Sequence, residues 1–419
     1  MKKFALLFLI LLLTVPVFAA DNVMFDYQGR VKVQGQSYDG TGYFKFAIVN
    51  NPGTTSLWSN DMTSENGGEP DTAITANVQE GIFNVTIGDP AVGMEPINRT
   101  VFNHPNKIKL RTWFSDGTHG FQQLLPDRKL NNVELMGMVS GNEDFTIYVD
   151  SINGDDENNG LTTETAKQHI QAAVDVLPAK LECNVTIDVA DGVYREEALI
   201  VSINGVPGKG SLTINGDESW SPSSPSDPGV RITGMNTSGT VVRHYGVSVV
   251  ESSQIFLRGL LMDNTHTGFN SGDANVRLYN CKSTDNVRGM ICNKSTCRFY
   301  DCLSESNDQY GFIIIYNSFT QFIDCIAQTN SLSGIYIQTQ SSANFYSSGD
   351  FSDNGENGIY VDKNSSAHFT DGYSGQINDN GDYGILVRYA SNTINHGANS
   401  FSGNVDGPVY TEHGGQTYP

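Results

Sequence analysis

The sequence predicts an all-β protein whose C-terminal two-thirds winds into a right-handed parallel β-helix, behind a β-sandwich-like domain. Glycine recurs at steps of 21 to 26 residues, and an apolar residue lies upstream of each of the first six glycines. The glycines are Gly268, Gly289, Gly311, Gly334, Gly358, Gly384 and Gly407. The apolar column is Leu257, Leu278, Phe299, Phe322, Phe345 and Phe369. A repeat of about 23 residues with strands and no helices is typical of a β-solenoid.

The first 20 residues have the pattern of a secretory signal peptide. Lys2 and Lys3 precede an apolar run over 4–13, and small residues follow near Ala19 and Ala20. The run is shorter than a membrane span, so we expect cleavage and export rather than a retained anchor. The mature chain is therefore predicted to be secreted or held at the cell surface, without a membrane span.

The charge of the chain excludes one class of partner. The formal net charge is −21, whereas nucleic-acid binding needs clustered Lys and Arg to neutralise phosphates. No partner DNA or RNA is therefore expected. An acidic exported protein either binds Ca²⁺ or simply remains soluble through its charge.

Residues 21–140 are predicted to form an N-terminal β-sandwich-like domain. Alternating runs at 43–49 and 81–87 are typical of strands, and Asn/Gly/Pro segments such as Asn51-Pro52-Gly53 mark turns between them. The segment from Gly141 to Asp144 is the expected junction with the β-helix, which is predicted over 145–419.

The β-helix is expected to begin with a cap. A short strand over 147–149 is followed by a polar loop over 150–160. Apolar residues at Ala166, Ile170, Ala173, Val174 and Leu177 then lie on one helical face. One amphipathic helix followed only by strands is typical of a cap that covers the open end of a solenoid.

Each later repeat is expected to form one rung, with equivalent residues about 4.8 Å apart in neighbouring rungs. The phenylalanines then stack in the core beside a second inward column: Met290, Phe312, Ile335, Ile359 and Ile385. An asparagine three or four residues before each glycine is expected to form an amide ladder in the turn. This column is Asn264, Asn286, Asn307, Asn330, Asn354, Asn380 and Asn404.

Residues 145–199 resemble the start of pectate-lyase-like β-helix proteins. The matching motifs are Ile147-Tyr148-Val149-Asp150, Asn153-Gly154-Asp155, Asn159-Gly160-Leu161, Ile170-Gln171-Ala172-Ala173-Val174 and Val189-Ala190-Asp191-Gly192-Val193-Tyr194. The later rungs resemble the general right-handed β-helix repeat. This superfamily contains lyases, hydrolases, epimerases, tailspikes and adhesins, so the resemblance implies a fold and leaves the activity open.

The N-terminal region resembles a β-domain found at the front of exported bacterial and phage-like fibre proteins. The likeness rests on Asp26-Tyr27-Gln28-Gly29-Arg30 and on Leu124-Leu125-Pro126-Asp127-Arg128-Lys129-Leu130. It implies a targeting or display module.

One candidate catalytic group lies in a turn column beside the phenylalanines. Asp301 and Asp324 occupy equivalent places in adjacent rungs, about 5 Å apart. Such a pair either binds Ca²⁺ or supplies the acid and nucleophile of a glycosidase. With Arg298 as a base it would also suit a lyase. The alternative is that Asp is present because its side chain bonds the backbone of a turn.

The neighbouring outward column is a candidate substrate-binding surface. Arg277 begins it, and Tyr279, Tyr300 and Tyr346 lie two positions further along their strands. Aromatic faces and arginines would contact sugar rings. The alternative is ordinary strand surface, where tyrosine is common.

Two further groups have open interpretations. Asp150, Asp155 and Asp156 lie in one loop and would supply oxygen ligands to Ca²⁺, although their spacing is not that of an EF-hand; turn formation and helix capping are the alternative. Cys281, Cys302 and Cys325 are equivalent in three rungs, so either Cys281–Cys302 or Cys302–Cys325 is bridged, or all are free buried thiols.

Two functions remain after these observations. The first is an exported β-helix protein that binds extracellular polysaccharide or a cell surface without catalysis, as the regular rungs and short loops after Gly268 favour. The second is a polysaccharide lyase or glycoside hydrolase, which requires acidic and basic side chains to converge on one face.

Overall fold

The computed structural model describes residues 22–98, 101–102, 108–130, 143–395 and 399–418. These residues form two compact units. One contains the described residues up to Phe102 together with Lys109–Arg128, and the other contains Ile108 and the described residues from Lys129 onward. The expected signal peptide and part of the expected junction lie outside the described residues. Among those described, no helix has the length and apolar character required to cross a bilayer.

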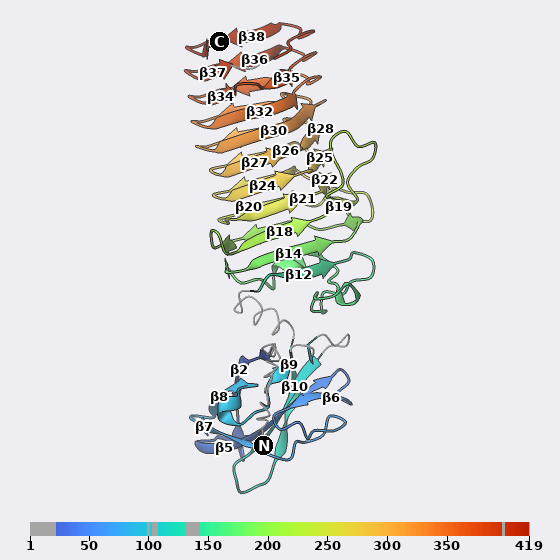
Figure 1. The fold of residues 1–419 in the computed structure, drawn as a ribbon, viewed down its shortest axis with the longest axis vertical. Coiled ribbons are helices and arrows are strands. Elements are labelled where there is room, and N and C mark those ends of the chain that lie inside the picture. The colour runs from blue at the N-terminus through green and yellow to red at the C-terminus, as the bar shows by residue number, and fades with distance from the viewer. Residues whose placement is uncertain (1–21, 99–100, 103–107, 131–142, 396–398, 419) are drawn as a thin grey trace, which may run out of the picture. The chain divides into compact units, whose positions relative to one another are not determined.

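The first unit is rich in β-strands (Figure 1). Its five-stranded sheet contains β5 (Gly40–Asn50), β6 (Ser56–Ser59), β7 (Ile74–Val78), β10 (Ile108–Ser115) and β11 (Gln122–Lys129). Three strand pairs accompany it: β1 (Asn22–Val23) with β9 (Ile97–Asn98), β2 (Phe25–Arg30) with β8 (Ile82–Ile87), and β3 (Lys32–Val33) with β4 (Gln36–Ser37). Phe44 of β5 packs on Phe83 of β8 at 4.2 Å between ring centroids. The runs expected as strands at 43–49 and 81–87 thus belong to β5 and β8.

The second unit is a parallel β-solenoid with three rows of strands. The first row is β12 (Phe145–Val149), β14 (Asn184–Val189), β18 (Ser211–Asn215), β21 (Ile255–Arg258), β24 (Asn275–Tyr279), β27 (Thr296–Tyr300), β30 (Phe319–Gln328), β32 (Ser342–Asp350), β34 (Ser366–Phe369), β37 (Asn392–Asn395) and β39 (Gln416–Tyr418). The second is β15 (Gly192–Tyr194), β19 (Val230–Thr233), β22 (Leu260–Asp263), β25 (Lys282–Thr284), β28 (Leu303–Glu305), the later parts of β30 and β32, and β35 (Ser374–Gln376). These two rows share one 17-stranded sheet.

The third row forms a separate nine-stranded sheet. Its strands are β16 (Ala198–Val201), β20 (Tyr245–Val250), β23 (Thr267–Gly272), β26 (Arg288–Asn293), β29 (Phe312–Ile315), β31 (Ile335–Gln338), β33 (Ile359–Val361), β36 (Tyr383–Val387) and β38 (Gly407–Thr411). Short strands β13 (Lys180–Leu181) and β17 (Asn204–Gly205) pair beside the first rungs. Figure 1 shows the rungs stacked in chain order from green to red.

The core contains the two predicted inward columns. Phe299, Phe322, Phe345 and Phe369 are register partners in successive strands. Their rings stack at centroid separations of 5.4, 5.2 and 4.7 Å. Phe312 of the third row packs against Phe299 at 5.1 Å between ring centroids, and Met290 is its register partner in the neighbouring rung. The predicted stacking of phenylalanines is confirmed.

The asparagine ladder is confirmed with one correction. Asn286, Asn307, Asn330, Asn354, Asn380 and Asn404 are linked in series by hydrogen bonds to the side-chain oxygen of the next asparagine. The prediction for Asn264 is wrong. Asn264, with φ of 51°, lies one position before Thr265, and Thr265 occupies the ladder position of that rung. The Thr265 backbone N–H and hydroxyl donate to Asn286 Oδ1 at 2.8 and 2.7 Å.

A serine column in the third turn was not predicted. Ser295, Ser318, Ser341, Ser365 and Ser391 are buried. Each of the first four donates its backbone N–H to the hydroxyl of the next serine at 3.1–3.2 Å. Serine is so common in exposed loops that its period does not stand out in the sequence.

The expected cap helix is shorter than the apolar pattern predicts. Only α2 (Ile170–Val174) is α-helical, after a short 3₁₀ turn, η3 (Thr163–Thr165). Lys167 bridges Val149 of β12 in extended conformation, so the chain between Ala166 and His169 cannot be helical. Ile170, Ala173 and Val174 still belong to the core of the solenoid.

Candidate functional site

The candidate site is the outward side of the first row at β21, β24 and β27. Alternate residues of a strand point to opposite faces, so Phe299 points inward while Arg298 and Tyr300 point outward. Arg277 pairs in register with Arg298, and Tyr279 with Tyr300. We call Arg258, Arg277, Tyr279, Arg298 and Tyr300 the arginine–tyrosine face.

The two paired arginines lie next to each other without an acidic partner. Arg277 lies over the ring of Phe256, 5.3 Å from its centroid. Within the part of the chain that the structure describes, neither Arg277 nor Arg298 has an ion pair or a side-chain hydrogen bond. Like charges directly opposite on neighbouring strands repel each other. Both guanidinium groups are thus available to an anion.

The tyrosines of the face are already stacked. The Tyr279 and Tyr300 rings are 4.6 Å apart and nearly parallel, and Arg258 lies 4.4 Å from the Tyr279 centroid. Tyr346 is two rungs from Tyr300, because Ile323 occupies the intervening position. Its hydroxyl accepts hydrogen bonds from Gln321 and Asn344 at 3.4 and 3.2 Å. Tyr300 and Arg258 cover the faces of the Tyr279 ring. A sugar could therefore contact only the edge and the hydroxyl group of Tyr279.

Asp301 lies between β27 and β28, and Asp324 is the equivalent residue within β30, where the chain passes from the first row to the second. Both are in the left-handed region, with φ of 49° and 52°, which Asp tolerates better than most residues. Partial desolvation of its carboxyl group, and then the neighbouring Asp324 charge, raise the pKa of Asp301, which is otherwise an exposed residue. Asp324 Oδ1 accepts hydrogen bonds from the Ser348 backbone and hydroxyl at 3.2 and 2.6 Å. The carboxylates are electrostatic neighbours, and that of Asp324 is hydrogen-bonded to Ser348 of the next rung.

Arg298 is not joined to either aspartate by an ion pair among the described residues. It lies in the middle of β27, whereas Asp301 follows the end of that strand. The structure therefore places the carboxylates where the first row of strands passes into the second, a line of turns that we call the ridge. Arg298 lies beside this ridge, on the outer face of the first row.

A loop over 217–229, which no repeat in the sequence indicates, covers the turn before Asp301. Asn280, the turn residue one rung before Asp301, donates its side-chain amide to Trp220 O at 2.6 Å and Glu218 O at 3.2 Å. Lys282 binds Asp227 of the loop and Glu305, both at 2.7 Å. The buried Trp220 among serines and prolines was the available signal.

The candidate calcium ligands are each engaged separately. Asp150 accepts bonds from Ile152 and Asn153. Asp155 accepts one from the Glu157 N–H. Asp156 binds the backbone N–H groups of residues 168 and 169 and the His169 ring. Across the described ranges, no group of three or more His, Cys, Asp or Glu side chains is placed to hold a metal ion.

Comparisons with known proteins agree with this fold. Residues 226–373 match the family model described as "Right handed beta helix region". Residues 26–127 match one described as a domain of unknown function, DUF8740. No curated protein sequence matches the chain.

Several solved structures are similar in fold. The mannuronan C-5 epimerase AlgE6 A-module of Azotobacter vinelandii has 14% identity and a TM-score of 0.39, over 60% of this chain and 93% of that one. An alginate lyase from Paenibacillus sp. str. FPU-7 has 12% identity and a TM-score of 0.32, over 66% of this chain and 98% of that one. A pectin methylesterase from Aspergillus niger has 16% identity and a TM-score of 0.31, over 64% of this chain and 85% of that one. These likenesses carry no information on activity. Residues 226–373 therefore form a right-handed parallel β-helix, the fold that the resemblance to pectate-lyase-like proteins predicted.

Proposed function

We propose that this chain is an exported protein that binds an acidic extracellular polysaccharide through the arginine–tyrosine face, without cleaving it. The observation that carries the proposal is the register pairing of Arg277 with Arg298 in a chain of formal net charge −21. Export rests on the basic and apolar start of the sequence.

Electrostatics favours an anionic ligand at this position. Two guanidinium groups on neighbouring strands repel each other until an anion lies between them. Guanidinium groups bind carboxylates and sulfates through paired hydrogen bonds. A uronate or sulfated sugar would therefore relieve a repulsion that is present in the free protein.

The surroundings favour a polymer over a small ligand. The face continues along the solenoid into Gln321 and Asn344, whose amides supply neutral hydrogen-bonding groups. On its other side the loop over 217–229 covers the turn at Asn280. A flat face beside a covered ridge suits an extended chain that contacts several rungs.

Affinity electrophoresis with polygalacturonate and with neutral dextran tests the proposal. We expect retardation by polygalacturonate only, weakened by salt because exposed charges are screened. Arg277→Ala and Arg298→Ala should each weaken binding about tenfold, from the loss of one charge-assisted interaction.

The matched control is Arg288→Ala, which removes an arginine from β26 in the other sheet, where it binds Gln309. This variant should bind like the unmodified protein. Equal retardation by dextran, or equal losses in all three variants, would disprove a site at the arginine–tyrosine face.

A second candidate function is cleavage of the polysaccharide by Asp301 and Asp324, with Arg298 as a base. It is favoured by the raised pKa of Asp301, which partial desolvation and then the Asp324 charge produce, because a general acid needs such a shift. Reducing-end and unsaturated-product assays distinguish it from binding alone. Product formation that Asp301→Asn abolishes would replace the binding proposal with this one.

A further inference from the structure

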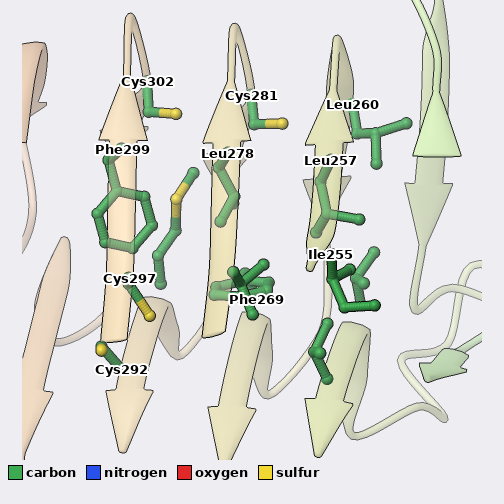
Figure 2. Packing of buried hydrophobic residues seen from close by; sticks show 14 of the residues in the cluster. Ile255, Leu257, Leu260, Phe269, Leu278, Cys281, Cys292, Cys297, Phe299 and Cys302 are labelled. Atoms are coloured by element: carbon green, nitrogen blue, oxygen red, sulfur yellow. The ribbon is translucent and has the colours of Figure 1, made fainter. Parts of the chain in front are cut away.

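Two cysteines meet across the third turn of one rung. Cys292 lies near the end of β26 and Cys297 near the start of β27, with four residues between them. Both are fully buried, and both side chains belong to the core of the solenoid. Figure 2 shows the two side chains entering the same part of the core from the two sides of the turn. Ser271 is the register partner of Cys292, and its Oγ lies 3.2 Å from Cys297 Sγ, which places the Cys297 thiol beside the column that contains Cys292.

The other stacked cysteines have a different geometry. Cys281, Cys302 and Cys325 each donate the thiol to the carbonyl two residues earlier in the chain, at 3.3–3.4 Å. They therefore share one side-chain orientation, and Figure 2 shows Cys281 and Cys302 parallel. A disulfide needs side chains that converge. Parallel side chains on neighbouring strands do not provide this.

We propose that Cys292 and Cys297 form a disulfide bond during export, whereas Cys281, Cys302 and Cys325 remain thiols. The bond would join the third row to β27 directly beside Arg298. The cysteine spacing left two pairings open, Cys281–Cys302 and Cys302–Cys325. The proposed bond is neither of these, because it joins a different pair. All six cysteines are free thiols in the present structure.

The chemistry is thiol–disulfide exchange with a disulfide oxidant such as oxidised glutathione. One cysteine thiolate attacks the oxidant, releases one molecule of reduced glutathione and forms a mixed disulfide. The second thiolate attacks that mixed disulfide, releases another reduced glutathione and forms the Sγ–Sγ bond. Both cysteine protons are released to solvent or the departing thiolates, and the two electrons reduce the oxidant.

The order of events follows from burial. Burial, and then the neighbouring Cys292 thiol, raise the pKa of Cys297, so the folded thiol is protonated and shielded from the oxidant. The bond must therefore form before the rungs close over it. A loop of four residues closes quickly and at a small entropic cost in an unfolded chain.

Peptide mapping of the full chain tests the proposal, because trypsin separates the two cysteines. The chain is refolded with oxidised and reduced glutathione, alkylated under denaturing conditions, and digested without reductant. Cleavage at Lys294 places Cys292 in the peptide 289–294 and Cys297 in 295–298, while Cys281 lies in 278–282 and the pair Cys302 and Cys325 in 299–363. We expect 289–294 linked to 295–298, with the other peptides alkylated.

Recovery of both short peptides as alkylated monomers would disprove the bond. Linkage of 278–282 to 299–363 would also overturn the assignment, because it would place a bridge in the parallel column. In the variant Cys292→Ser, peptide 295–298 should be fully alkylated. Capture of Cys297 by any other cysteine in that variant would show that the pairing is not directed by the turn. These readouts use denatured chain, so they remain decisive even if a variant folds poorly.

Discussion

Asn354 Oδ1 accepts hydrogen bonds from both the backbone N–H and the side-chain amide of Asn330, at 3.2 and 3.0 Å. Asn330 Oδ1 in turn accepts the equivalent pair from Asn307, at 3.2 and 2.9 Å. The remaining amide proton of Asn330 is directed to Ser304 O at 3.1 Å. Each buried amide therefore holds two rungs together and satisfies backbone groups that no strand partner reaches.

Asn330→Leu should destabilise the solenoid strongly. Leucine keeps about the same volume but leaves two donors of Asn307 without an acceptor, at about 1–3 kcal/mol for each buried group. Urea denaturation measures the loss. Ser331→Leu is the control, since Ser331 is exposed in the same turn and should change stability by less than about 0.5 kcal/mol. Equally small losses of stability in both variants would mean that the asparagine ladder does not stabilise the stacked rungs.

The fold could be predicted because its determinants repeat. Phe299, Phe322, Phe345 and Phe369 recur with the rung, and the period itself excludes other repeat folds. The error at Asn264 has the same origin. Both Asn264 and Thr265 are polar turn residues, and only the left-handed φ of Asn264 separates their roles.

The site could be predicted only in part. The columns through Arg277, Tyr279 and Asp301 follow from the register, so their neighbours in adjacent rungs were foreseeable. The contacts of Trp220 and Asp227 with Asn280 and Lys282 were not, because the loop over 217–229 interrupts the repeat. Loops of this kind have no period, and their packing depends on tertiary contacts.

Phe322→Ala should cost about 3–5 kcal/mol, from lost burial and the cavity that remains. The Phe322 ring lies between Phe299 and Phe345 and also meets Phe312 at 5.1 Å. Thermal unfolding measures the change. Tyr316→Ala, at a side chain that is 47% exposed, should leave the melting temperature nearly unchanged, and a similar shift in both variants would argue against the phenylalanine column as a main stabilising element.

Ser318→Ala tests the unpredicted serine column. The Ser318 hydroxyl accepts the Ser295 N–H at 3.1 Å and donates toward Ile315 O at 2.6 Å. Alanine would leave the buried Ser295 N–H unpaired, at about 1–3 kcal/mol. Hydrogen exchange of that amide should accelerate together with the loss of stability. The exposed Ser238→Ala should do neither, and an unchanged Ser295 amide in Ser318→Ala would show that water replaces the hydroxyl.

Asp301 should make the stability of the protein depend on pH. Partial desolvation, and then the charge of Asp324, raise its pKa above the ordinary value of 3.8. The folded state consequently binds the Asp301 proton more tightly than the unfolded state. Its contribution to stability is fully present below the unfolded pKa and is lost as pH rises through the folded pKa.

Acidification from neutral pH toward about pH 4 should therefore stabilise the unmodified protein relative to Asp301→Asn, as measured by urea denaturation at each pH. Asp324→Asn keeps an oxygen acceptor for Ser348 but removes the charge, so it should lower the pKa of Asp301 while the effect of desolvation remains. Carboxyl-carbon NMR follows that titration, with Asp308→Asn, which removes a different exposed carboxylate, as control. An unchanged Asp301 titration in Asp324→Asn would mean that the two carboxylates do not interact. The acid–nucleophile function would then lose the observation that favours it.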